Sequence, residues 1–150
     1  GLVSYMWRSE QMTAAQFDIM INHESGLLGI SETSSDMRDL LARETQDVRA
    51  AEALALFCYR VKKQIGAYAA TLGGLDTLVF AGGIGENASS IRLRISQGLE
   101  FLGIKLDESH NAAHSDRISS DASRVSVRVI RTDEELMIAI LICQVLGINI

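Results

Sequence analysis

The residues best suited to binding a ligand lie in the glycine-rich segment Gly82–Asn87. This segment separates a short apolar run from a predicted helix. Glycines at such a position let the backbone turn sharply and approach a ligand, because no Cβ intervenes. The helix that follows offers unpaired N–H groups and a partial positive charge to an anion, and Asn87 is well placed to cap that helix. The segment therefore predicts a nucleotide-type loop, although a purely structural turn explains the same glycines.

Two phosphate-binding patterns can be compared with this segment. Residues 83–88 satisfy Gly-x-Gly-x-x-Ala, the dinucleotide fingerprint, and Asp107 follows Gly83 by 24 positions, near where a ribose-binding acid would lie. The fingerprint normally follows the first strand of a βαβ unit, whereas three helices are predicted before this loop. NAD binding is thus an alternative that fits poorly. A P-loop is excluded, because no Gly-Lys-Ser/Thr follows.

The elements before the loop are predicted to be helical. Thr13 and Gln16 form the pattern of a capping box, which starts a helix that runs to about Asn22. Glycines then interrupt the helix, and a shorter one begins near Ser35. Over residues 51–72, apolar residues recur at steps of three and four, which predicts a long helix with one apolar face. This face is interpreted as core, with a dimer interface as the alternative.

The elements after the long helix alternate between strand and helix. The apolar run at residues 76–80 suits a strand buried on both faces, as in a parallel sheet. A helix is predicted over residues 88–99, and alternation over residues 125–129 predicts a half-buried strand. Residues 103–106 are a weak third strand candidate. Thr132 opens the last helix, with Glu135 completing a capping box. This order predicts an α/β fold that is rich in helix and has a small, mainly parallel sheet.

Composition excludes several classes of protein. A formal net charge of -5 over 150 residues, with no basic stripe, argues against nucleic-acid binding. The longest apolar stretch, at residues 136–143, is shorter than the about 20 residues that a membrane span needs. Cys58 and Cys143 lie in apolar helical surroundings without a partner at metal-ligand spacing, so they are interpreted as core thiols rather than zinc ligands. We therefore expect a cytoplasmic protein.

Several segments together resemble one known family. The stretch Val79–Asn87 resembles the adenosine-binding signature of acetate kinases, within the sugar kinase, Hsp70 and actin superfamily. Residues 24–31, 34–38, 98–104 and 132–136 resemble further segments of that family's C-terminal part, in the same order. The resemblance implies that residues 1–150 are the C-terminal nucleotide-binding portion of an acetate kinase-like protein. The fold would be an incomplete ribonuclease H-like (actin-like ATPase) domain, with the N-terminal domain and the first strands absent.

The resemblance also implies the ligands and the residues that hold them. The cofactors would be ATP/ADP and Mg, with Glu134 at the position of the family's magnesium-associated glutamate. One carboxylate plus nucleotide phosphates is how Mg²⁺ is usually held. An acid can accept from ribose hydroxyls, and a guanidinium can stack on adenine or meet phosphate. Without the resemblance, Asp36 would be interpreted as an acid at the start of a helix and Arg38 as a surface charge. The nucleotide-binding residues implied are Gly83, Ile84, Gly85, Glu86 and Asn87, and in a second segment Asp36, Met37 and Arg38.

The sequence departs from the family pattern at three places. Ala81 replaces the usual threonine, and Arg131 replaces the usual proline. From Ile140 onward the last helix is unusually apolar, where the family's helix turns polar, and the apolar segment extends over residues 136–146. A helix that is apolar all round must be buried, so this one is expected to be covered or to form an adhesive surface.

The activity of the isolated chain is expected to be limited. In the family, ATP and acetate give ADP and acetyl phosphate, and the acetate pocket and catalytic residues lie upstream of the segments matched here. We expect no catalytic residue in this chain, and His23, His110 and His114 are interpreted as surface residues. The chain is then either a kinase portion, inactive alone, or a non-enzymatic dimerisation or nucleotide-binding module. The resemblance implies a homodimer in both cases.

Overall fold

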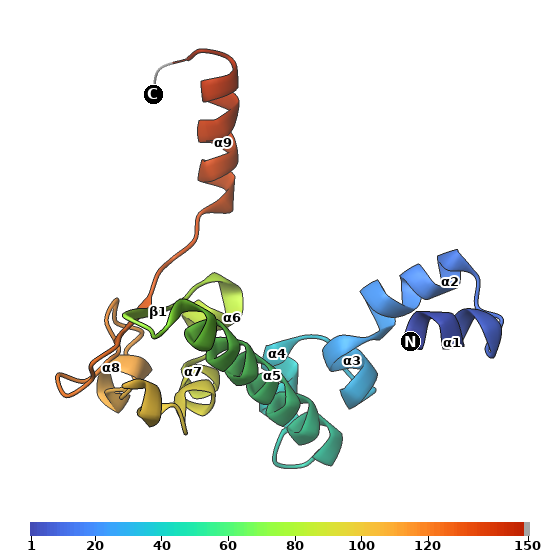
Figure 1. Ribbon diagram of the computed structural model, residues 1–150, viewed down its shortest axis with the longest axis horizontal. Coiled ribbons are helices and arrows are strands. Elements are labelled where there is room, and N and C mark those ends of the chain that lie inside the picture. Colours follow the sequence, from blue (N-terminus) through green and yellow to red (C-terminus); the bar gives the residue numbers. More distant parts are fainter. Residues whose placement is uncertain (149–150) are drawn as a thin grey trace. The chain divides into compact units, whose positions relative to one another are not determined.

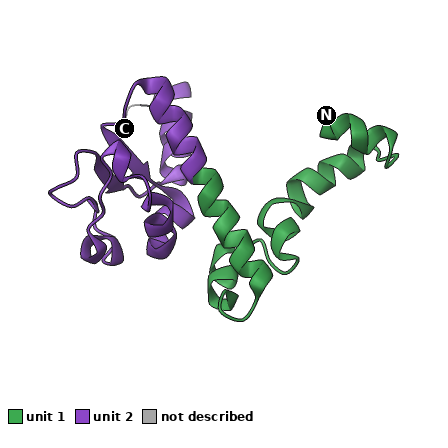
Figure 2. Ribbon diagram, turned by 60° about the horizontal axis from the view of Figure 1, so that its bottom comes forward, with its two compact units in different colours: residues 1–61 green, residues 62–150 purple. Residues whose placement is uncertain are grey.

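The computed structural model describes residues 1–148, and these form two compact units (Figures 1 and 2). The first unit comprises Gly1–Val61 and the second begins at Lys62. The chain order of the elements is α1 (Leu2–Arg8), α2 (Ala14–Ile19), the π-helix η1 (Met20–Glu24), α3 (Gly26–Ser31), α4 (Met37–Arg43), α5 (Val48–Leu72), β1 (Thr77–Phe80), α6 (Gly82–Asn87), α7 (Ser89–Ser96), the 3₁₀ helix η2 (Glu100–Leu102), α8 (Glu108–Ala112), β2 (Ser126–Val129) and α9 (Glu134–Val145).

The start of α2 confirms the predicted capping box. The hydroxyl of Thr13 accepts from the N–H of Gln16, and the Gln16 side chain accepts from the N–H of Thr13 at 2.9 Å. Two N–H groups that a helix start leaves unpaired are thereby satisfied. The helical segment continues through η1 to Glu24, two residues beyond the expected end.

Of the two glycines that were expected to interrupt the helix, Gly26 does so and Gly29 does not. Ser25 is extended and Gly26 has a φ of +66°, which breaks the preceding helix. However, α3 begins at once and includes Gly29. A Cβ on Gly29 would lie 2.8 Å from the carbonyl oxygen of Glu24, so the glycine permits this close approach of backbone to backbone.

The first unit is packed around α4 and the first half of α5. The shorter helix predicted near Ser35 is confirmed as α4. The predicted long helix is confirmed as α5, which has 25 residues and contains the boundary between the units. The apolar face expected on α5 is buried at Leu54 and Cys58, but Tyr68 and Leu72 are 65% and 72% exposed. The interpretation of this face as core thus holds only for its first half.

The second unit contains a parallel sheet of two strands among the described residues. β1 pairs with β2 in the register Thr77 with Ser126 through Phe80 with Val129. The half-buried alternation predicted for β2 is confirmed, because Val127 and Val129 are buried and Arg128 is exposed.

The prediction that β1 is buried on both faces is wrong. Phe80 is buried, but Val79 is 46% exposed, because no described element of this chain covers that face of the strand. The third strand candidate is also not a strand. Leu106 forms only an isolated antiparallel bridge with Ser119, and Gly103, with a φ of +93°, is the C-cap of η2 and not part of a strand.

The chain between the two strands folds into α6, α7, η2 and α8 and supplies the core of the second unit. The helix predicted over residues 88–99 is shorter than expected, and α7 ends at Ser96. Buried side chains from α7 and from the segment that leads into β2 make up this core; they are Ile91, Ile95, Leu99, Ile104, Ile118 and Val125.

The last helix, α9, is exposed along its apolar length in the described part of the chain. Leu136, Ile138 and Leu141 are each more than half exposed, so the surface expected to be adhesive is present. Within the described residues, no helix combines the length and apolar character that crossing a membrane would require. Of the two cysteines interpreted as core thiols, Cys58 is buried and Cys143 is only partly buried.

Candidate nucleotide-binding site

The glycine-rich segment predicted as a loop is a short helix, α6, at the carboxyl end of β1 (Figure 1). Ala81 is extended and leads directly into Gly82, which has a φ of +69°. This left-handed conformation favours glycine and turns the chain from strand into helix. The ends of parallel strands are where α/β proteins commonly bind ligands, so the position of the segment is the expected one.

The two inner glycines of α6 do different work. A Cβ on Gly83 would meet nothing within 4 Å, whereas a Cβ on Gly85 would lie 3.1 Å from the carbonyl carbon of Phe80. Gly85 therefore allows α6 to pack against the end of β1. Gly83 and Asn87 are four residues apart, share one exposed face of the helix, and leave that face open to a ligand.

The prediction that Asn87 caps the next helix is wrong. Its side-chain amide instead donates to the carbonyl of Gly83 at 2.9 Å, within α6. The residue at the N-cap of α7 is Ala88, which has no side chain able to cap. The amide of Asn87 thus lies on the open face of α6, beside Gly83.

The carboxylate of Glu86 accepts the hydrogen bond from the N–H of Gly82, the first N–H of α6. Its Oε1 accepts from the N–H of Gly82 at 3.0 Å, and also from the N–H and the hydroxyl of Thr132, both at 2.9 Å. The bonds from Thr132 are the main reason that the pKa of Glu86 lies below its ordinary value. The N–H of Gly82, the first of α6, is consequently satisfied from within the chain.

The start of α9 also differs from the prediction. Thr132 is engaged with Glu86, and Asp133 caps the helix by accepting from the N–H of Leu136 at 2.8 Å. Glu135 therefore completes no capping box. Glu134 is the first residue of α9 and is exposed, and among the described residues it makes no hydrogen bond or ion pair. It offers an uncommitted carboxylate directly after an anchored segment.

In the first unit, Asp36, Met37 and Arg38 form the start of α4. Asp36 caps the helix by accepting from the N–H of Arg38 at 2.8 Å. Its carboxylate also receives Nε and Nη2 of Arg38, at 3.1 and 2.6 Å. These bonds lower the pKa of Asp36 from 3.8 to about 2. The capping role that the residue types alone suggested is thus real.

The same arrangement leaves Arg38 available to a ligand. One edge of its guanidinium is held by Asp36, but the side chain is 89% exposed, so its planar face is open to stacking or to phosphate. Met37 is only 5% exposed and anchors the segment in the core of the first unit. Ser34 fixes the approach to the helix, because its hydroxyl accepts from the N–H of Asp36 at 3.0 Å.

Arg92 is a residue of the site that sequence reasoning missed. It is fully buried on α7, and its Nη1 donates to the carbonyls of Gly85 and Glu86, both at 2.9 Å. The ring Nδ1 of His114 lies 2.8 Å from the same carbonyl of Glu86 and donates to it. A lone arginine on an amphipathic helix is typical of a surface position, so the sequence contains no signal for this contact.

The histidines match the sequence analysis only in their exposure. His23, His110 and His114 are all exposed, as interpreted. His110 lies within α8. His114 has a φ of +52° and reaches the site segment through Glu86, which the sequence does not indicate.

A cavity of about 580 Å³ in the second unit adjoins the site segment. Glu86 and Asn87 line it on one side, and its other lining residues are Ala113, His114, Asp116, Val129 and Arg131. The cavity has charges of both signs. Arg131, which departs from the family pattern, helps lower the pKa of the neighbouring Glu86.

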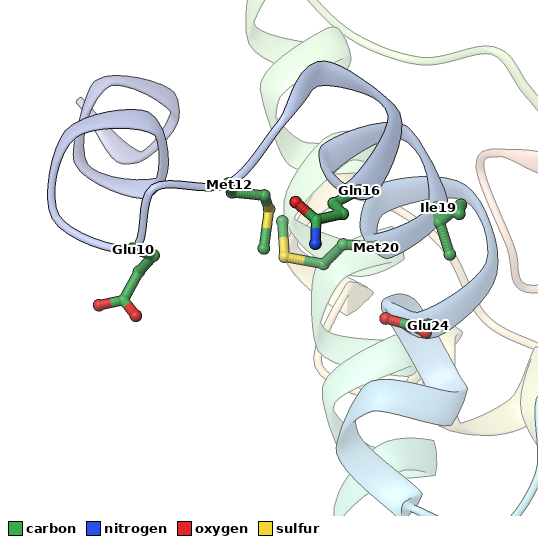
Figure 3. A pocket seen from close by; sticks show the side chains of 6 residues that line it. All are labelled: Glu10, Met12, Gln16, Ile19, Met20 and Glu24. Carbon is green, nitrogen blue, oxygen red and sulfur yellow. The ribbon is translucent and has the colours of Figure 1, made fainter.

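A separate cavity of about 370 Å³ lies in the first unit and contains none of the predicted site residues. Its wall includes Met12, Gln16 and Met20, whose side chains point toward a common centre in Figure 3, together with Glu10, Ile19 and Glu24.

The predicted residues fall into two groups. The second unit brings the residues of α6 together with the segment that leads to Glu134, through Glu86 and Thr132. Asp36, Met37 and Arg38 form the other group, in the first unit. No three His, Cys, Asp or Glu side chains gather into a metal-binding cluster in residues 1–148. Asp107, the acid of the dinucleotide alternative, caps α8 by accepting from the N–H of His110 at 2.9 Å.

Comparison with known proteins identifies the family. The sequence profile described as "Acetokinase family" matches residues 1–140. An acetate kinase of Rhodopseudomonas palustris is 50% identical over 141 residues, which are 93% of this chain and 35% of that protein. An acetate kinase of Clostridium botulinum is 46% identical over 144 residues, covering 93% of this chain and 36% of its own. The chain therefore spans about a third of the length of the curated relatives it matches.

Solved structures of the same kind match the fold. Porphyromonas gingivalis acetate kinase has a TM-score of 0.87 at 39% identity, covering 97% of this chain and 38% of its own. A propionate kinase of Francisella tularensis has a TM-score of 0.83 at 37% identity, covering 92% and 36%.

The fold of this chain is therefore part of an actin-like ATPase fold. This confirms the fold class expected from the sequence. The chain belongs to the acetokinase family.

Proposed function

We propose that this chain is the nucleotide-binding part of an acetate kinase-like phosphotransferase and binds ATP or ADP with Mg²⁺. The observation that carries the proposal is the open face of α6. Gly83 presents backbone with no atom within 4 Å of where its Cβ would be, and the Asn87 amide lies beside it. Backbone without side chains and a nearby amide suit close contact with a nucleoside.

Arg38 and Glu134 complete the proposed set of ligands. The exposed face of Arg38 would stack on the base or meet phosphate, while Asp36 holds its edge. Glu134 fits a magnesium ligand, because Mg²⁺ is held by one or two carboxylates together with phosphate oxygens and water. The ion would neutralise phosphate charge; the chain's own part is to present one exposed carboxylate at the start of α9.

The proposal assigns no phosphoryl transfer to the 150 residues alone. Transfer depends on positioning the acceptor and on neutralising charge at the transferred group. Here the chain matches about a third of the length of its relatives, and none of its residues is proposed as catalytic. The acetate site, and any preference for acetate over propionate, is expected in the part of the relatives that this chain does not match. We further propose a cytoplasmic homodimer, as the family resemblance implies.

Complementation tests the proposal. The part of the Rhodopseudomonas palustris acetate kinase that this chain does not match would be mixed with the purified chain, and acetyl phosphate formation from ATP and acetate would be measured. We expect activity only in the mixture. The same mixture made with the Gly83→Ala variant should form less acetyl phosphate. Binding of nucleotide without any complementation would instead support a non-enzymatic nucleotide-binding module.

A further inference from the structure

Arg92 is a buried cation with no carboxylate among its hydrogen-bond partners, and the ring Nδ1 of His114 lies 3.4 and 3.5 Å from its Nη2 and Nη1. The Arg92 side chain is 0% exposed, and its acceptors are the carbonyls of Gly85, Glu86 and Asn111 together with the side-chain oxygen of Asn111. Burying a guanidinium is costly unless its donors are satisfied. This residue satisfies them at the ends of two short helices rather than with a carboxylate.

The partners explain why an arginine can be stable here. The carbonyls of Gly85 and Glu86 belong to the last turn of α6, and that of Asn111 belongs to the last turn of α8. Carbonyls in a last helical turn have no partner within the helix and carry a partial negative charge, which favours a cation. One planar fork therefore joins the ends of α6 and α8, with Nη1 on α6 and with Nη2 and Nε on α8.

Lysine could not make the same set of contacts. All the N–H donors of lysine are on one nitrogen, whereas three different nitrogens of Arg92 donate to the acceptors on α6 and α8. Asn111 is fixed in turn, because its amide donates to the carbonyl of Ser89 at 2.9 Å. The network holds the carbonyls of Gly85 and Glu86, which lie between Gly83 and Asn87 along α6.

We infer that Arg92 is a positioning residue for nucleotide binding: it holds the backbone of Gly85 and Glu86 so that Gly83 and Asn87 keep their open face. The inference rests on the proposed function, since it concerns the same segment. Arg92 touches no proposed ligand, and it acts only through the carbonyls of α6.

Amide hydrogen exchange of the whole chain tests the inference without any ligand. In Arg92→Lys, protection of the amides of residues 86–88 should fall about tenfold or more, while the amides of β1 and β2 keep their protection. Arg124→Lys is the matched control, because Arg124 also donates to a backbone carbonyl, that of Leu102, away from α6. Unchanged protection in Arg92→Lys, or an equal loss across α6, β1 and β2, would overturn the inference.

Asn111→Ala keeps the test available should R92K not fold. It removes one acceptor of Arg92 and leaves both carbonyls of α6 in reach, so we expect a smaller loss confined to the same amides. No loss there would count against the inference.

A titration with Mg·ADP separates this inference from the proposed function. If the unaltered chain binds Mg·ADP, Arg92→Lys should weaken binding about tenfold, whereas Arg124→Lys should not; equal affinity in the two variants would overturn the positioning role. If the unaltered chain binds none, the proposed function fails, and the exchange result alone decides whether Arg92 positions α6.

Discussion

The carboxylate of Glu86 is joined to the N–H and hydroxyl of Thr132 across 46 residues of sequence, with both bonds at 2.9 Å. This contact ties the turn after β1 to the segment between β2 and α9. Because Glu134 follows two residues later, the same carboxylate that closes the start of α6 also anchors the proposed magnesium ligand. Glu86 thus joins two segments of the candidate site, and its expected contact with the nucleotide stays a prediction.

The Glu86–Thr132 contact should depend on pH. The pKa of Glu86 is lowered in the folded protein from 4.5, so its stabilising effect is complete above that ordinary value and is lost as the pH falls through the lowered pKa. We expect the protection of the Thr132 amide to disappear over that acidic range, as measured by hydrogen exchange. Glu86→Gln should have low protection at every pH, because the charge is absent. Protection that stays constant through the acidic range would contradict the assigned contact.

The Asp36–Arg38 pair makes a second prediction about titration. The Asp36 carboxyl carbon, followed by NMR, should titrate with a midpoint of about 2 rather than 3.8. Arg38→Gln should move the midpoint back toward 3.8, since the bonds from the Arg38 side chain are the largest cause of the shift. The stabilisation by this pair is therefore complete above pH 3.8 and is lost as the pH falls toward 2. A midpoint near 3.8 in the unaltered chain would show that the pair does not form in solution.

The two inner glycines of α6 should differ in how much the same substitution changes the free energy of unfolding. Gly85→Ala places a methyl group 3.1 Å from the backbone of Phe80 and should destabilise the chain by about 1–3 kcal/mol. Gly83→Ala meets no atom within 4 Å, so its free energy of unfolding should change by no more than about 0.5 kcal/mol. Chemical denaturation measures both.

Nucleotide binding, unlike stability, should depend on Gly83. A methyl group on the open face should weaken Mg·ADP binding about tenfold, or by about 1.4 kcal/mol, although the fold is intact. If Gly83→Ala bound Mg·ADP as tightly as the unaltered chain does, the open face of α6 would not be the nucleotide contact.

Local signals in the sequence predicted the elements that depend on near neighbours. The capping box of Thr13 and Gln16 and the alternation of Val127 and Val129 are satisfied within a few residues, so their patterns could be recognised. The segment resemblance indicated α6 as the candidate nucleotide site, which stays a prediction. The parallel pairing of the two strands agrees with the alternating order of strands and helices that the sequence predicted.

The contacts that the sequence did not reveal join residues far apart. Thr132 had a local partner available in Glu135, but it bonds to Glu86 instead, and Asp133 takes over the cap. The sequence analysis did not single out Arg92, because nothing near it in sequence indicates the carbonyls of α6 and α8. The exposure of Val79 depends on what covers the sheet, which an apolar run cannot specify.

The central claim, that this chain binds a magnesium nucleotide through α6 and α9, is tested most directly by calorimetric titration of the chain with Mg·ADP. NAD serves as the control ligand. Glu134→Ala is the test variant, and Glu135→Ala, an exposed acid in the same first turn of α9, is the matched control. We expect binding of Mg·ADP but not of NAD, weakened in Glu134→Ala and unchanged in Glu135→Ala. Binding of NAD in preference to ADP, or no binding of Mg·ADP at all, would contradict the claim.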